Sequence, residues 1–209
     1  MATPREIKKR IQAVGNTKKI TKTMEMVSTA KAKKAVDRLN ASKPYSDKLQ
    51  EAIRTLASNA TDVNHPLLKV PDSIHKVGIL VITSNRGLCG GFNNNVIRLA
   101  VKTIEEYKQN GVEVDVTLMG KKAISTFKFN KMDFAEGLPG LEDNPVYEEA
   151  AQLANQYMDK FIEGEYDKVE IISTRYLNSA VQEAQIKKVL PLTLENTEED
   201  SSSHGGGFI

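Results

Sequence analysis

The 209-residue sequence has one cysteine, no tryptophan and no apolar run near 20 residues. A lone Cys89 excludes an internal disulfide and suits a reducing compartment. Without a long apolar run, no transmembrane helix is expected. The N-terminus also lacks the apolar core of a secretory signal, and because Glu6 belongs to a helix-start pattern, a transit peptide is not expected either.

The sequence also lacks the patterns that build an active site. Gly87, Gly90 and Gly91 are spaced G-x-x-G-G, unlike the dinucleotide pattern G-x-G-x-x-G, and no GK[ST] motif occurs. A helix start near these glycines leaves a small anionic ligand open, but a tight turn explains them more simply. No His/Asp arrangement would activate Cys89, and the three histidines lack metal-ligand spacing. We predict no catalytic residue, no metal and no cofactor.

What the sequence does have is a long basic stretch, from Thr3 to about Leu56, that reads as one helix. Thr3 can cap the free backbone N–H groups, Pro4 suits the first helical position, and Glu6 can close a capping box. At 1.5 Å per residue, some 50 residues would span roughly 75–80 Å. A domain of this size cannot enclose such a rod, so we expect it to project and bind a partner.

The charge distribution is lopsided although the net charge is only +2. Residues 1–43 carry twelve Lys and Arg against three acidic residues, a local charge of +9. The remaining residues carry 17 basic and 24 acidic side chains, a charge of −7. This asymmetry predicts that the rod meets an acidic partner.

Two apolar triplets lie on helix faces about 140° apart at 100° per residue. They are Ile7, Ile11 and Val14, followed by Ile20, Met24 and Val27. The change falls at Gly15-Asn16, so either two amphipathic helices meet there or one continuous helix has different neighbours along its length. Further on, Leu49, Ile53 and Leu56 have the spacing of a helix–helix seam.

From Lys76 the pattern becomes strand, loop and helix, beginning with the continuous apolar run of residues 77–82 that is typical of a buried parallel strand. Alternating strands and helices predict an α/β domain with a mainly parallel sheet. The elements expected after this strand are helices at 94–108, from 121 and at 146–161, strands at 112–119 and 169–173, and an extended segment within 174–192. The expected organisation is a helix at 1–60, a linker at 61–75, the α/β domain at 76–194 and a polar, Gly-rich tail at 195–209.

Two stretches carry a family resemblance. Residues 5–39 include Gly-Asn-Thr-Lys-Lys-Ile-Thr-Lys-Thr-Met-Glu-Met-Val, and residues 83–93 read Thr-Ser-Asn-Arg-Gly-Leu-Cys-Gly-Gly-Phe-Asn. They resemble the N-terminal helix and the central-domain segment of the gamma subunit of rotary (F-type) ATP synthases. The family motif in the central domain corresponds to Arg86, Gly87, Leu88, Cys89, Gly90 and Gly91.

This resemblance implies a fold and a role. In the family, the N-terminal helix is half of an antiparallel coiled coil inside a ring of alternating alpha and beta subunits. A Rossmann-like α/β domain lies below it, against the epsilon subunit and the membrane c-subunit ring. Rotation of this shaft couples proton transport to ATP synthesis or hydrolysis in the beta subunits, so the chain is expected to be a non-catalytic rotor subunit. The absence of a plastid-type cysteine insertion favours the cytoplasmic face of a bacterial plasma membrane.

The resemblance also implies contact residues. Lys18, Lys19, Lys22 and Met24 are expected to face acidic loops of the beta subunits, and Phe208 is expected near the membrane ring. The family's second long helix should follow the central domain, whereas this sequence stops at Ile209. We therefore expect a fragment or a truncated chain.

Two alternative functions are a nucleic-acid-binding protein and a nucleotide-binding α/β enzyme. A nucleic-acid-binding protein could place the basic helix in a groove, but the rod uses mainly Lys and has no aromatic residue before Tyr45. A nucleotide-binding α/β enzyme would need a phosphate motif and titratable catalytic groups, and the sequence offers neither.

Overall fold

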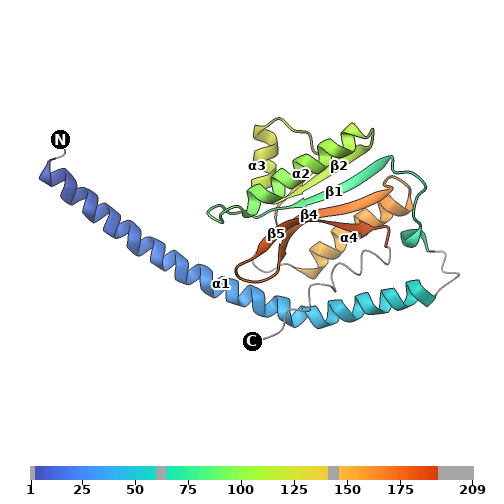
Figure 1. Cartoon of the computed structure of the whole chain (residues 1–209), viewed down its shortest axis with the longest axis horizontal. Coiled ribbons are helices and arrows are strands. Elements are labelled where there is room, and N and C mark those ends of the chain that lie inside the picture. Colours follow the sequence, from blue (N-terminus) through green and yellow to red (C-terminus); the bar gives the residue numbers. More distant parts are fainter. Residues whose placement is uncertain (1–2, 60–64, 141–145, 193–209) are drawn as a thin grey trace. The chain divides into compact units, whose positions relative to one another are not determined.

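The computed structural model describes residues 3–59, 65–140 and 146–192. The chain divides into two units, Met1–Ile53 and Arg54–Ile209. The first unit is helical from Pro4 onward, and the second contains an α/β domain (Figure 1).

The long helix α1 runs from Pro4 to Asn59, 56 residues that span about 84 Å at 1.5 Å per residue. Its start is the predicted capping box: the Thr3 N–H donates to Glu6 Oε2 at 2.8 Å, and the Glu6 N–H donates to Thr3 Oγ1 at 3.4 Å. The helix continues through Gly15 and Pro44, so the interpretation as one continuous helix is confirmed. One glycine costs only about 1 kcal/mol in a helix interior, which the neighbouring strong helix formers can offset.

The α/β domain holds a five-stranded sheet in the order β3-β2-β1-β4-β5. Strands β1 to β4 are parallel to one another, and β5 pairs antiparallel with β4 at the edge. The strands are β1 (Lys76–Ile82), β2 (Glu113–Met119), β3 (Glu136–Leu138), β4 (Lys168–Tyr176) and β5 (Gln182–Leu190). The helices are η1 (Pro66–Leu68), α2 (Phe92–Gln109), α3 (Lys121–Phe129) and α4 (Tyr147–Ile162). The predicted α/β class with a mainly parallel sheet is confirmed.

Some elements differ from the sequence-based prediction. The three-residue strand β3 and the short helix η1 were not predicted, because neither is long enough to show a periodic pattern. Helix η1 lies within residues 61–75, where a linker is expected, and Leu67 packs against a buried cluster of the α/β domain. The last extended segment forms β5, which lies antiparallel because a short hairpin joins it to β4.

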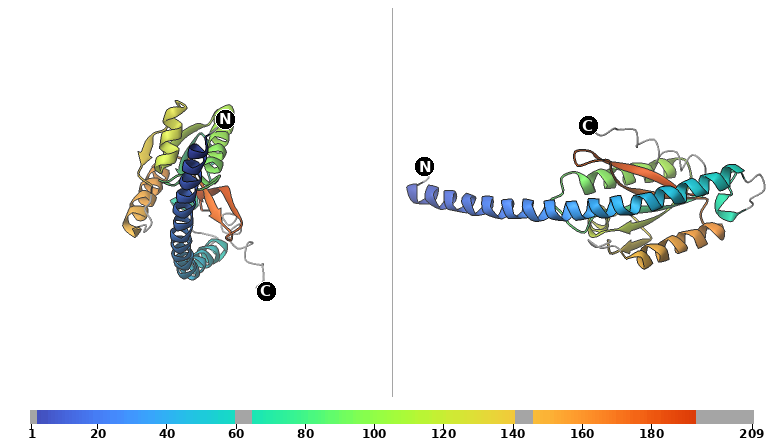
Figure 2. Two further views of the ribbon diagram at one scale, coloured as in Figure 1. Left: turned by 90° about the vertical axis from the view of Figure 1, so that its left-hand side faces the viewer. Right: turned by 90° about the horizontal axis from the view of Figure 1, so that it is seen from below.

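Helices cover both faces of the sheet (Figure 1), and the views of Figure 2 keep α2 and α4 on opposite sides. On one face, α2 and α3 pack over a core that includes Val77, Ile79 and Val81, each fully buried. On the other face, a smaller cluster joins α4 to β4 and β5. Strand β1 is therefore apolar on both faces, which explains its continuous hydrophobic run.

Candidate functional site

The surface of α1 carries large apolar side chains that nothing within its own unit covers. The two triplets predicted from the helical wheel have exposed fractions between 48% and 68%. Single exposed apolar residues are common, but two groups of three on one helix are typical of a surface that binds other proteins. These residues are Ile7, Ile11, Val14, Ile20, Met24 and Val27.

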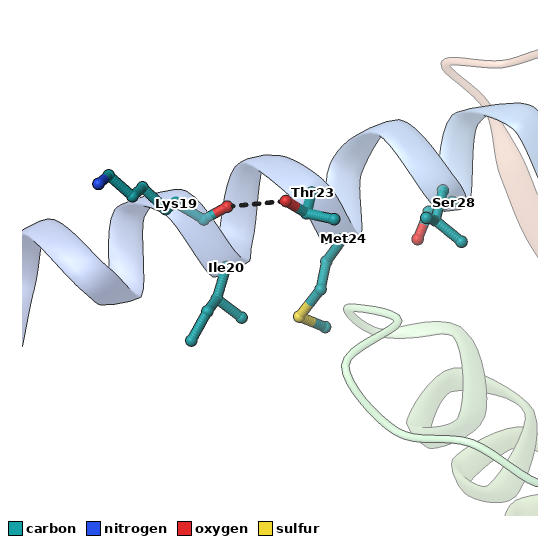
Figure 3. A pocket seen from close by; sticks show the side chains of 6 residues that line it. Lys19, Ile20, Thr23, Met24 and Ser28 are labelled. Atoms are coloured by element: carbon teal, nitrogen blue, oxygen red, sulfur yellow. Dashed lines mark hydrogen bonds between the residues drawn. The ribbon is translucent and has the colours of Figure 1, made fainter.

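The second triplet borders a shallow depression on α1 that Lys19, Thr23 and Ser28 complete. Ile20 and Met24 point to the same side of the helix in Figure 3, and the Thr23 hydroxyl donates to the Lys19 carbonyl at 3.1 Å. The surface thus combines an apolar strip with a lysine at its edge. This surface suits a partner that offers an apolar side chain to the strip and a negatively charged group to the lysine.

The basic side chains predicted for partner contact are all exposed on α1. Lys18 and Lys22 lie four residues apart and therefore on one side of the helix. Lys22 also forms an ion pair with Glu25 at 3.1 Å, in which both side chains are more than 60% exposed. An exposed pair of this kind contributes at most about 1 kcal/mol, so a carboxylate of a partner can compete for Lys22.

The predicted motif residues lie in the second unit, in the segment 84–91, here named the motif loop, which joins β1 to α2. Leu88 has φ of 59° and Gly90 has φ of 59°, both in the left-handed region. Leu88 is 94% exposed, although a leucine is costly both in water and at positive φ. Such a residue is expected where a side chain is displayed for a partner.

The base of the motif loop is held by contacts to distant parts of the domain. Thr83 Oγ1 accepts from the Ala123 N–H at 3.0 Å, which ties the end of β1 to α3. Asn85 Oδ1 accepts from the Lys121 N–H at 3.0 Å, and Asn85 Nδ2 donates to the Gly140 carbonyl at 3.1 Å. These polar residues were not identified from the sequence, because their partners lie 36 to 55 positions away.

The space beneath the motif loop is occupied by a side chain of α2. Asn93, at the start of α2, is buried beneath the loop and hydrogen-bonds to Ser84 and Arg86. The residue that caps α2 is Gly91, which has no side chain to accept a hydrogen bond. The glycines therefore permit a turn that a buried asparagine fills, and this arrangement does not resemble a phosphate-binding loop.

A groove of about 340 Å³ lies on the other face of the sheet, between α4 and the strands. Its lining is apolar except for Tyr157, and includes Leu80, Ile171, Leu153 and Val189. None of the described residues that line it carries a charge. Because a nucleotide needs polar partners for its phosphates, this groove does not suit one.

Residues 3–59, 65–140 and 146–192 lack two other kinds of site. No group of three or more His, Cys, Asp or Glu residues in this part of the chain could hold a metal ion. None of the described helices is long and apolar enough to cross a membrane. The predicted contact residue Phe208 and the tail at 195–209 lie outside the described residues.

The chain matches known proteins over nearly its whole length. A family model described as ATP synthase matches residues 3–206. An ATP synthase gamma chain of Leptospira biflexa is 52% identical over 203 residues, which cover 97% of this chain and 70% of that protein. A gamma chain of Rhodopirellula baltica is 35% identical over 205 residues, which cover 98% of this chain and 69% of that protein.

Two solved structures share the fold. One is the rotor of the Euglena gracilis mitochondrial ATP synthase, with TM-score 0.57 and 21% identity, covering 97% of this chain and 68% of that one. The other is the central stalk and c-ring of the Tetrahymena thermophila mitochondrial ATP synthase, with TM-score 0.65 and 20% identity, covering 88% and 86%. Neither a nucleic-acid-binding protein nor a nucleotide-binding enzyme is favoured by these matches. By its sequence similarity to both gamma chains and to the family model, this chain belongs to the ATP synthase gamma-chain family.

Proposed function

We propose that this chain is the non-catalytic rotor subunit in the central stalk of a proton-transporting ATP synthase. It couples rotation of a membrane c-subunit ring to ATP synthesis or hydrolysis in the beta subunits. The proposal rests on the family membership and on one structural observation, the 56-residue helix α1 with its exposed apolar side chains and basic surface.

Helix α1 is the shaft in this proposal. Its six apolar triplet residues are each about half exposed. Covering them with a partner would add on the order of 5–10 kcal/mol, since a fully buried side chain of this size contributes about 1.5–3 kcal/mol. That amount is comparable to the whole stability of a typical domain, so a partner surface is needed to stabilise the rod.

The proposed partners are the alpha and beta subunits around residues 1–60, with the epsilon subunit and the c-subunit ring at the α/β domain of residues 76–194. Lys18, Lys19, Lys22 and Met24 contact the beta subunits. A rotating contact has to be released at each step, which exposed ion pairs of about 1 kcal/mol or less allow. Phe208 contacts the membrane ring.

The motif loop forms a second contact surface, in which Arg86 and Leu88 face a neighbouring subunit. The subunit is peripheral to the cytoplasmic face of a bacterial plasma membrane and associates with that membrane only through the complex. The chain itself binds no nucleotide. A calorimetric titration of the isolated chain with ATP is expected to give no saturable heat, and saturable binding would support the nucleotide-binding alternative.

The decisive experiment reverses charge on α1 in the assembled complex. Lys18→Glu, Lys19→Glu and Lys22→Glu together should reduce ATP-driven proton pumping, because three attractive contacts with acidic loops become repulsive. Pumping is measured in reconstituted vesicles, and ATP hydrolysis is measured in parallel.

A matched control reverses three exposed lysines of the α/β domain, Lys108, Lys128 and Lys131. It changes the net charge by the same amount and should leave coupling intact. Unchanged hydrolysis and pumping in the α1 variant would contradict the assigned contact, whereas equal losses in both variants would indicate a non-specific charge effect.

A further inference from the structure

The side chain of Asn93 lies beneath the motif loop and connects several of its residues by hydrogen bonds. This residue lies in the first turn of α2 and is only 7% exposed. Its Oδ1 accepts from the Ser84 N–H at 2.9 Å and lies 3.1 Å from the Ser84 hydroxyl oxygen, which shares its one hydrogen with the Arg86 carbonyl. Its Nδ2 donates to the Arg86 carbonyl at 3.1 Å and to Cys89 Sγ at 3.1 Å. One buried amide thus joins three residues of the loop.

We infer that Asn93 is a positioning residue of the rotor, which holds the motif loop in the one shape that displays Leu88 to a neighbouring subunit. This inference rests on the proposed function of the chain. Asn93 itself touches no partner, because it is buried beneath the loop. It acts through Ser84 and Arg86, whose backbone positions determine where the loop tip lies.

The chemistry of an asparagine suits this position better than that of other side chains. The loop offers donors at Ser84 on one side and acceptors at Arg86 and Cys89 on the other. An amide supplies both an acceptor and two donors, whereas an aspartate supplies only acceptors. Asn93→Asp should therefore keep the Ser84 side of the network and lose the Arg86 side.

The displayed conformation needs such support. Leu88 has positive φ and is almost fully exposed, so its own side chain contributes little to keeping the loop in place. The Arg86 carbonyl accepts both from Asn93 Nδ2 and from the Ser84 hydroxyl, at 3.1 Å and 2.7 Å. Without Asn93, the first of these two bonds is lost, and so is the bond from the Ser84 N–H to Asn93 Oδ1.

The first test uses the full chain in solution. Trypsin cleaves after arginine, and the Arg86–Gly87 bond includes the carbonyl that Asn93 holds. Asn93→Ala should speed cleavage at this bond about tenfold, which corresponds to the loss of roughly one or two net hydrogen bonds. The amide exchange of Ser84 should speed by a similar factor, while exchange of Val81 in β1 stays unchanged if the domain remains folded.

Asn94→Ala is the matched control, because Asn94 is the same residue type, one position further along α2, and exposed. It should leave cleavage and exchange unchanged. If Asn93→Ala unfolds the domain and raises exchange at Val81 as well, Asn93→Asp provides the measurement. This variant should speed cleavage at Arg86 but leave exchange at Ser84 unchanged.

The second test measures coupling in the assembled complex. Asn93→Ala should reduce the number of protons pumped per ATP hydrolysed, and Asn94→Ala should not. Unchanged tryptic cleavage would overturn the inference, and so would faster cleavage combined with full coupling. Either result would leave the charge-reversal effect of the α1 lysines intact, so failure of this inference is distinguishable from failure of the proposed function.

Discussion

Gly78 provides the sharpest stability prediction, because the rings of two tyrosines meet over it. A Cβ at this position would lie 2.9 Å from Cδ2 and from Cε2 of Tyr166, and 3.3 Å from Cε1 of Tyr157. Gly78 pairs with Asp115 of β2, and the Tyr166 hydroxyl donates to Asp115 Oδ2 at 2.6 Å. The Tyr166 ring therefore crosses β1 directly above the glycine to reach the next strand.

The ring cannot move aside without losing these contacts. Lys160 Nζ donates to the Tyr166 hydroxyl at 3.2 Å and lies 5.3 Å from the ring centroid. Gly78→Ala should cost about 1–3 kcal/mol from overpacking. Displacing the hydroxyl from the Asp115 carboxylate would add about 1–2 kcal/mol. We expect a total of about 2–5 kcal/mol, which lowers Tm by roughly 5–20 °C in a domain of this size.

Urea unfolding followed by circular dichroism measures this cost. Gly15→Ala is the matched control, because a Cβ at Gly15 has no neighbour within 4 Å. There the same substitution should stabilise the helix by about 1 kcal/mol. Combining Gly78→Ala with Tyr166→Ala should cost less than the sum of the single changes. An unfolding free energy within 0.5 kcal/mol of the parent for Gly78→Ala would refute this reasoning.

Three further predictions concern charge and capping. Lys168→Met should cost about 3 kcal/mol in urea unfolding, because it leaves the buried Glu170 carboxylate without the ion pair at 2.5 Å. Adding Glu170→Gln should recover at least half of that cost, and a cost below 1 kcal/mol for the single change would be inconsistent with the pair. Burial raises the pKa of Tyr157 to about 12, so stability present below pH 10 should be lost between pH 10 and 12, by up to about 1.4 kcal/mol per pH unit. Tyr157→Phe should flatten this part of the pH profile, and an unchanged slope would contradict the assignment. Glu6→Ala removes the acceptor of the Thr3 N–H and should speed amide exchange at Thr3 by several-fold, corresponding to about 1 kcal/mol.

Features that depend on neighbouring residues along the chain were predictable from the sequence. The start of α1 follows from Thr3, Pro4 and Glu6, which interact within a single helical turn. The continuity of α1 past Gly15 follows from the summed helix propensity of its neighbours. The apolar run of residues 77–82 indicated a strand covered on both faces, and the loop after it carries the family motif. In each case the determining contacts are local, so their pattern is visible without the fold.

Only the tertiary structure decided the contacts that join distant segments. Tyr166 meets Asp115 across 51 positions, and Asn85 meets Gly140 across 55 positions. No periodic pattern in the sequence predicts such pairs, because each contact depends on which strands become neighbours in the sheet. The burial of Asn93 under the motif loop is decided in the same way, since the fold of the loop turns a polar residue of an amphipathic helix inward.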